Sequence, residues 1–134
     1  MVSNSNARSV VGEVLERFMQ LISSRNMEVH SEFVSDNNAL LVGSDKGEIA
    51  KGQSEIRQFF TRIFARYVTF SWEANWINAF QAGNLMWFFA DGEMTVESPQ
   101  GQKKGPYRIS GVVEQIGDHW LWRQYHGSEP VAVD

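Results

Sequence analysis

Histidine 126 is the first candidate for chemistry, because an imidazole can take or give a proton near neutral pH. It follows Trp120, Trp122 and Gln124 at two-residue intervals. In a β-strand, residues with this spacing lie on one face. We therefore expect His126 to share an apolar pocket with the two indoles. The alternative is a histidine whose ring nitrogens bond to the backbone or to a neighbouring side chain at the edge of a sheet.

Asp91 is the second candidate, on the same expected strand face as Trp87 and Phe89. Burial among aromatic rings disfavours the charged form of a carboxyl group, raises its pKa and suits it to move protons. The alternative is a structural ion pair with Arg108 on the next strand. Arg108 could instead bind an anionic or carbonyl oxygen of a ligand, and the two roles are compatible.

Several aromatic and amide side chains could complete the wall of such a pocket. An aromatic side chain in a strand belongs to a core or an interface more often than it contacts a ligand, so this assignment competes with a structural one for each residue. The predicted catalytic residues are Asp91 and His126, and the predicted ligand-binding residues are Arg108, Trp87, Phe89, Trp76, Trp122, Gln124 and Tyr67.

Other classes of site lack their usual residues. The chain has no cysteine, so thiolate metal sites and disulfides are excluded. His30 and His119 are too scattered to join His126 at a metal with usual ligand spacing. The net charge is -4, and the largest basic cluster is the pair Lys103–Lys104, which does not suit nucleic-acid binding. We expect no cofactor, no metal and no nucleic-acid or membrane partner.

Length and composition indicate one ordinary globular domain. The chain has 134 residues, of which 43% are hydrophobic and 21% charged. It contains no apolar segment typical of a signal peptide and no run of about 20 apolar residues that could span a membrane. We expect a disordered tail at residues 1–6, a single domain at residues 7–134 and a cytoplasmic location.

The first half of the chain has the patterns of helices. Apolar residues between Val10 and Ile22 recur at spacings of three and four, which predicts an amphipathic helix. A third helix should begin near Gly52, with Ser54 as its N-cap. Between these lie a short helix at residues 27–33, a strand at 39–43, a turn at 44–47 and a minor strand at 48–51.

The second half changes to a period of two. Turn signals divide it into strands at residues 68–80, 85–97, 105–116 and 119–126, which predict an antiparallel meander. Helices followed by a long sheet indicate an α+β fold, with the helices packed on one face of a curved sheet. The strand near residues 84–97 is apolar on both faces, so we expect a homodimer formed through the sheet.

Four short motifs along the chain, given below, resemble those of the SnoaL-like branch of the nuclear transport factor 2-like superfamily, which includes relatives of ketosteroid isomerase. The resemblance implies a cone-shaped, cystatin-like fold with an interior pocket. It rests on Phe33-Val34-Ser35-Asp36-Asn37, on Lys51-Gly52-Gln53-Ser54-Glu55-Ile56-Arg57-Gln58-Phe59-Phe60, on Tyr107-Arg108-Ile109-Ser110, and on Gly117-Asp118-His119-Trp120 with His126-Gly127-Ser128.

Two comparisons within this superfamily limit what the resemblance implies. The last motifs are similar to the association domain of calcium/calmodulin-dependent kinase II, where an arginine matching Arg108 lines a pocket. Two further pocket arginines of that domain correspond to positions near Phe89 and Gly127, and neither is present here. The general base of ketosteroid isomerase would fall near residues 41–44, whereas Asp45 comes later, in the expected turn. Its acidic oxyanion donor would fall near Ser110.

Three classes of function remain open at this point. The first is a binding domain for a small, largely apolar molecule. The second is a cyclase, isomerase or dehydratase in which an Asp/His pair moves a proton beside a carbonyl group. The third is an assembly module without a ligand. One fold hosts many functions, so the choice depends on whether Asp91, Arg108 and His126 meet in one cavity.

Overall fold

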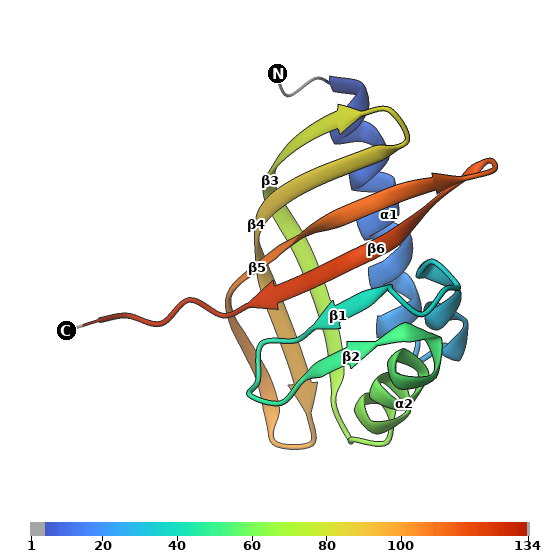
Figure 1. Cartoon of the computed structure of the whole chain (residues 1–134). Helices are drawn as coiled ribbons and strands as arrows, with labels where there is room; N and C mark the ends of the chain where they lie inside the picture. The colour runs from blue at the N-terminus through green and yellow to red at the C-terminus, as the bar shows by residue number, and fades with distance from the viewer. Residues whose placement is uncertain (1–4, 134) are drawn as a thin grey trace.

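A computed structural model describes residues 5–133 of the chain. Over this range the elements are α1 (Ser5–Ser23), η1 (Met27–Glu32), β1 (Leu40–Val42), β2 (Ile49–Lys51), α2 (Gly52–Phe64), β3 (Thr69–Ala82), β4 (Leu85–Ser98), β5 (Gly101–Ile116) and β6 (His119–Ser128). The predicted α+β class is confirmed, with helices preceding a long, curved antiparallel meander (Figure 1).

The strands form one sheet in the order β2-β1-β6-β5-β4-β3. Strands β3 to β6 pair antiparallel in sequence, as predicted. Strand β1 pairs with β6 in parallel, with Leu40 opposite Gln124 and Val42 opposite His126. The β1–β2 hairpin is therefore added to the end of the meander beside the last strand (Figure 1).

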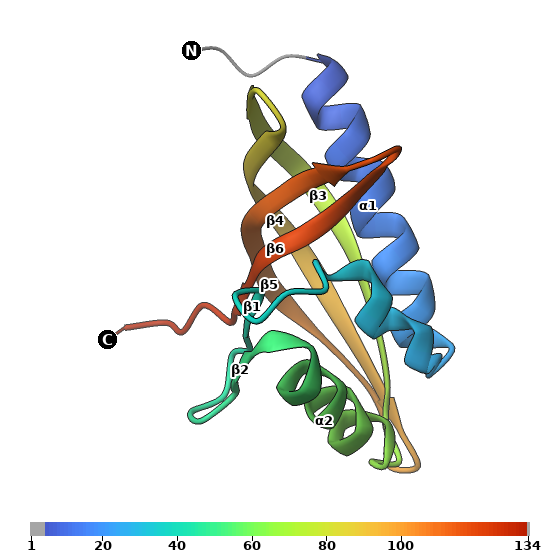
Figure 2. The ribbon, with the colours of Figure 1, turned by 45° about the vertical axis from the view of Figure 1, so that its right-hand side comes forward.

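Helix α1 covers one side of the sheet, which we call the inner face, and α2 lies below β1 and β2 (Figure 2). The buried residues of α1 recur at spacings of three and four: Ala7, Val11, Val14, Leu15, Phe18 and Met19. Burying this apolar stripe against the sheet stabilises the helix, because helices in proteins owe most of their stability to the packing of an amphipathic face. Ser5 and Asn6 belong to α1, so the predicted tail is wrong for them, and residues 1–4 lie outside the described residues.

The start of α2 differs from the predicted cap. Lys51 is the N-cap residue, and its backbone N–H donates to Glu55 Oε1 at 2.9 Å. Ser54 lies inside the first turn and caps nothing. Gly52 opens the helix with φ +81°, a conformation that a residue with a side chain adopts only under strain.

The core lies between α1 and the inner face and is rich in aromatic rings. Trp122 is fully buried, with its ring centroid 5.2 Å from that of Phe18 and 5.5 Å from that of Phe88. Phe33 and Phe60 extend this cluster toward α2. Strand β4 therefore turns Phe88, and not Trp87 or Phe89, toward the helices.

Two β-bulges change which side chains reach the inner face. In β6, Val112 pairs with Gln124 and Val113 with Trp122, so Arg123 is the extra residue. In β3, Asn75 is the extra residue between the paired positions Ala74 and Trp76. One extra residue reverses the alternation of all side chains beyond it. The sheet faces that the period-two pattern predicted for the side chains are consequently correct on one side of each bulge and inverted on the other.

Candidate functional site

Asp91 and Arg108 lie on the outer face of the sheet, opposite α1, so their predicted place inside the cone is wrong. They are paired across β4 and β5, with Arg108 Nε 3.9 Å from Asp91 Oδ1. Asn75 Nδ2 also donates to Asp91 Oδ2 at 3.1 Å. Both members of the pair contact solvent, with 47% of the Arg108 side chain and 30% of the Asp91 side chain exposed. This is the structural ion pair that stood as the alternative to catalysis.

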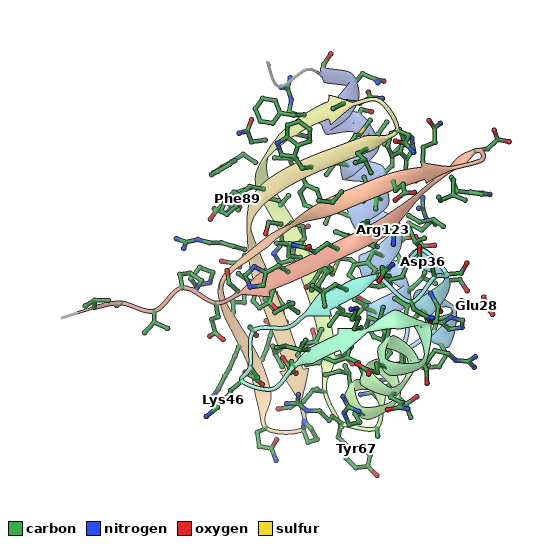
Figure 3. All side chains as sticks on the ribbon, viewed as in Figure 1. Glu28, Asp36, Lys46, Tyr67, Phe89 and Arg123 are labelled. Carbon is green, nitrogen blue, oxygen red and sulfur yellow. The ribbon has the colours of Figure 1, made fainter. Side chains whose placement is uncertain are left out.

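The predicted aromatic wall also lies on the outer face. Trp76 packs on Phe89 with ring centroids 5.6 Å apart, and Trp87 stacks on Phe80 at 5.7 Å. Phe89 projects away from the helices in Figure 3. The bulge at Asn75 explains the position of Trp76. The apolar character of both faces of β4 explains why sequence alone pointed Trp87 and Phe89 in the wrong direction.

The remaining predicted residues do not meet in a cavity either. His126 and Gln124 are exposed because the bulge at Arg123 turns them outward. Trp122 belongs to the core, and its Nε1 has no hydrogen-bond partner among the described residues. Tyr67 is 84% exposed in the connection between α2 and β3 (Figure 3). A polar trio of Asp91, Arg108 and His126 lining an interior cavity is therefore not formed.

A cavity of about 410 Å³ lies on the inner face, at the end of the sheet near α2 and the β1–β2 hairpin. It is open to solvent on one side and is bordered by α1, by α2, by the β1–β2 hairpin and by the adjoining ends of β3, β4, β5 and β6. Its apolar lining consists mainly of Phe18, Met19, Ile22, Leu41, Phe59, Phe60, Ile63, Phe70, Met94 and Val96. Such a surface favours an apolar ligand, since most of the cavity offers no hydrogen bond.

Two tyrosines of the sheet contribute to the cavity wall. Tyr107 on β5 and Tyr125 on β6 both point to the inner face, Tyr125 because of the bulge two residues before it. The Tyr107 ring lies over Gly127, where a Cβ atom would stand within contact of the phenol oxygen. Trp72 supports this strand by donating from Nε1 to the Tyr107 carbonyl oxygen at 3.0 Å.

Ser44 of the β1–β2 turn lines the cavity together with these tyrosines. Burial raises the pKa of the Tyr107 phenol, while hydrogen bonds with Ser44 and Tyr125 oppose this effect. Burial also raises the pKa of Tyr125 well above its ordinary value, and the nearby phenol of Tyr107 adds to the rise. Both side chains are therefore neutral hydrogen-bonding groups at physiological pH.

Charged groups line the rim of the cavity. Asp45 and Glu48 lie on the hairpin side, where Glu48 Oε1 accepts a hydrogen bond from the Asp45 backbone N–H at 2.9 Å. Glu129 follows the end of β6. Arg66, after α2, and Lys103, near the start of β5, add positive charge. Within residues 5–133, no cluster of three His, Asp or Glu side chains suits a metal ion.

Sequence reasoning did not select the residues that line this cavity. Tyr107 stood next to Arg108 in a recognised motif, and alternation places only one of the two on the inner face. Tyr125 was not predicted to face the cavity, because the sequence pattern around it fits a regular strand without a bulge. Asp45 was assigned to the turn, where it does lie, and this turn forms part of the rim.

Among the described residues, no helix combines the length and the hydropathy required to cross a membrane. The comparison with curated proteins finds no match. Solved structures do share the fold. One is a proposed dehydratase of the NTF2-like family from Streptomyces avermitilis, 12% identical with a TM-score of 0.83, over 95% of this chain and 98% of that one.

Two further structures have similar folds. A protein from Catenulispora acidiphila in complex with S-DNPA is 12% identical, with a TM-score of 0.81, over 94% of this chain and 95% of that one. A proposed calcium/calmodulin-dependent protein kinase II association domain from Xanthomonas campestris is 14% identical, with a TM-score of 0.77, over 92% and 87%.

The SnoaL-like domain profile matches residues 11–132, which is nearly the whole chain. The region includes most of α1, the residues that line the cavity and the complete sheet. The profile confirms the resemblance to SnoaL-like proteins that the motifs indicated, and the solved structures show that the fold is shared. The chain belongs to the SnoaL-like domain family.

Proposed function

We propose that this chain binds a small, largely apolar molecule in the cavity between α1, α2 and the sheet. The observation that carries the proposal is the lining of that cavity, in which aromatic and aliphatic side chains predominate and charged side chains lie at the rim. Its volume of about 410 Å³ lies in the usual range for small-molecule sites. The Catenulispora acidiphila structure in complex with S-DNPA supports a ligand-binding role for this fold.

Titration calorimetry with ethylnaphthalene, a compact apolar probe, tests this proposal. Met94 lines the cavity, so Met94→Trp should fill part of the space and weaken binding at least tenfold. Trp87→Ala is the control. It removes a large apolar side chain from the outer face, away from the cavity, and should leave the affinity for the probe unchanged. Failure of the parent protein to bind the probe, or equal binding by Met94→Trp, would contradict the proposal.

A second candidate is an enzyme of the cyclase, isomerase or dehydratase kind. The observation that favours it is the presence of tyrosine hydroxyls and hairpin carboxylates around one cavity. A hydroxyl of Tyr107 or Tyr125 would hydrogen-bond a developing oxyanion, and Asp45 or Glu48 would take the proton. Asp91 and His126 are not part of this candidate, because both lie outside the cavity. Asp45→Asn should then abolish turnover without weakening ligand binding.

We also propose that two copies associate through the outer face. Trp76, Leu85, Trp87 and Phe89 are exposed there in a contiguous region of β3 and β4, with Trp76 53% exposed. An apolar region of this kind on a soluble surface is typical of an interface. Light scattering after size exclusion should give twice the chain mass for the parent and the single mass for Trp87→Glu. A monomeric parent at micromolar concentration would refute the association.

A further inference from the structure

We infer that the cavity takes an amphipathic carboxylate, with its apolar part among the rings of the interior and its charged group beside Arg66 and Lys103 at the rim. This inference rests on the proposed binding function and names the class of ligand. It depends on where the two cations lie, on what holds them there, and on how far they stand from the carboxylates of the same rim.

Arg66 is held against the wall of the cavity. It follows the end of α2, where its backbone N–H donates to the carbonyl oxygen of Ile63 at 3.2 Å. Its guanidinium carbon Cζ lies 5.8 Å from the centroid of the Phe70 ring, and Phe70 lines the cavity. A cation over the face of an aromatic ring is attracted to it. This contact keeps the charge at the opening of the cavity.

Lys103 reaches the same end of the cavity from β5. Val96 of β4 lies opposite Phe70 of β3 on one side and opposite Lys103 on the other. Residues directly opposite one another in antiparallel strands point to the same face, so these three side chains form a row on the inner face. Figures 1 and 2 both show the β4–β5 turn beside the connection from α2 to β3. Arg66 and Lys103 therefore border one end of the cavity.

Neither cation has an acidic partner within residues 5–133. The ion pairs in this range involve other arginines, and the side chains of Arg66 and Lys103 form no hydrogen bond there. The N–H donors of the guanidinium and of the ammonium are therefore available to a ligand. A guanidinium binds both oxygens of a carboxylate at once, which makes this anion the best match for Arg66.

The carboxylates of Asp45 and Glu48 stand at another part of the rim. Both belong to the β1–β2 hairpin, which joins the sheet on the side of β6 that is remote from β5. The tip of this hairpin lies well away from the β4–β5 turn in Figure 2. Glu48 Oε1 accepts the backbone N–H of Asp45 at 2.9 Å, so this carboxylate is directed back to its own hairpin.

Glu129 is separated from Lys103 along the strands. Ser128 pairs with Arg108, so Glu129 comes at about the level of Tyr107. Lys103 lies four residues farther along β5, which corresponds to about 13 Å. This separation exceeds the screening length of about 8 Å at physiological ionic strength. The acidic groups of the rim therefore cancel little of the positive charge at the Lys103 end.

The lining next to the two cations is apolar. Phe70 and Val96 lie between them, and Met94 continues the wall inward. A ligand whose carboxylate rests on Arg66 and Lys103 thus places the rest of its structure on apolar surface, as is usual for sites with few polar groups. Both cations are exposed, so water and salt limit the gain in affinity that the charge provides.

Three naphthalene probes of nearly equal size test the inference at neutral pH: naphthoate, ethylnaphthalene and naphthylmethylammonium. In calorimetry the parent protein should bind naphthoate roughly three- to tenfold more tightly than ethylnaphthalene, the factor expected of exposed charge pairs. It should bind the ammonium most weakly. The advantage of naphthoate should shrink in about 0.5 M salt, because salt screens exposed charges.

The double variant Arg66→Gln/Lys103→Gln removes both charges from the cavity. The advantage of naphthoate should disappear, while the affinity for ethylnaphthalene should stay close to that of the parent. The matched control is Arg62→Gln/Lys46→Gln, which removes the same charges from exposed positions outside the lining. This control should retain the preference for naphthoate. Melting temperatures should verify that each variant is folded.

Equal affinities of the parent for naphthoate and ethylnaphthalene would overturn the inference and leave the proposed binding function intact. Tighter binding of the ammonium would also overturn it, since the acidic groups would then dominate the rim. A naphthoate preference that survives in Arg66→Gln/Lys103→Gln, or that the control loses equally, would overturn it because these two cations would not be its cause. Absence of binding by all three probes would instead contradict the proposed function itself.

Discussion

Trp122 and Tyr125 lie three residues apart on β6, and their rings nevertheless meet on the same face, with centroids 5.3 Å apart and planes at 77°. Residues with this separation point to opposite faces of a regular strand. The extra residue Arg123 brings them together. This bulge buries Tyr125 in the cavity wall and turns Gln124 and His126 outward, so it decides which groups a ligand can contact.

Gly111 makes room for the bulged strand, so a side chain at this position should destabilise the fold. A Cβ at position 111 would stand 3.0 Å from the Trp122 ring and in contact with the Gln124 carbonyl oxygen, an atom of the backbone. Gly111→Ala should therefore lower the free energy of unfolding by about 1–3 kcal/mol. Gly105→Ala, on the same strand with open space around it, is the control. Denaturant titrations that gave equal losses would contradict this account.

Gly127→Ala should act on the site more than on the fold. The new Cβ would collide with the Tyr107 hydroxyl, which is the far end of a side chain that can rotate. We expect the phenol to move away from Gly127, with retention of the folded structure and a change in the affinity for an apolar probe, because Tyr107 lines the cavity. Nuclear magnetic resonance of the tyrosine ring and calorimetry would detect the two changes. An unmoved Tyr107 resonance would argue against the packing described above.

The buried tyrosines predict a loss of stability at alkaline pH. Their folded pKa values are raised above the ordinary value of 10.0. Unfolded tyrosine ionises from about pH 10, whereas the folded groups stay neutral, so their stabilising contribution is complete below pH 10 and declines as the pH rises toward the folded pKa. In that window Tyr125→Phe should reduce the slope of unfolding free energy by about 1.4 kcal/mol per pH unit. Unchanged slopes would contradict its burial.

The bulge residue Arg123 predicts an effect at acidic pH. Arg123 Nη1 is 2.7 Å from Asp36 Oδ1 and its Nε is 3.0 Å from Glu114 Oε1; Figure 3 shows Asp36 and Arg123 facing one another. The hydrogen bond from Arg123 lowers the pKa of Asp36. This contribution is present above the unfolded pKa of about 3.9 and is lost as the pH falls toward the folded value.

Asp36→Asn should consequently destabilise the protein at pH 6 and have a smaller effect at about pH 3, which lies below the unfolded pKa of about 3.9, so that part of the contribution is already lost. Chemical unfolding at the two pH values measures the difference. Asp118→Asn, in the exposed β5–β6 turn, serves as the control for removing one negative charge. A loss in Asp36→Asn that does not depend on pH would mean that the ion pair contributes nothing.

Variants of the outer-face pair should leave binding untouched. Asp91 is engaged by Arg108 and Asn75 away from the cavity. Asp91→Asn should change the affinity for an apolar probe less than twofold and the stability by under about 1 kcal/mol, as expected for a solvent-exposed ion pair. His126→Gln should behave in the same way. A tenfold loss of affinity in either variant would show that the substituted residue contributes to ligand binding, contrary to this account.

The sequence by itself determined the elements and their order. Apolar spacing identified α1, and the turns at Gly83, Gly101 and Gly117 were predicted where the chain does adopt positive φ values of 61°, 124° and 62°. These features are local, because helix periodicity and turn conformation depend on neighbouring residues. The SnoaL-like motifs are likewise readable in sequence order and lead to the correct family.

Only the tertiary structure decided which faces meet. The bulges at Asn75 and Arg123 arise from pairing with neighbouring strands and reverse the alternation that sequence reasoning extrapolated. Strand β4 is apolar on both faces, so its own residues did not indicate the side that α1 covers. The cavity joins Ser44, Tyr107 and Tyr125 from distant parts of the chain, and their proximity depends on the parallel pairing of β1 with β6, a contact between distant segments with no local signal in the sequence.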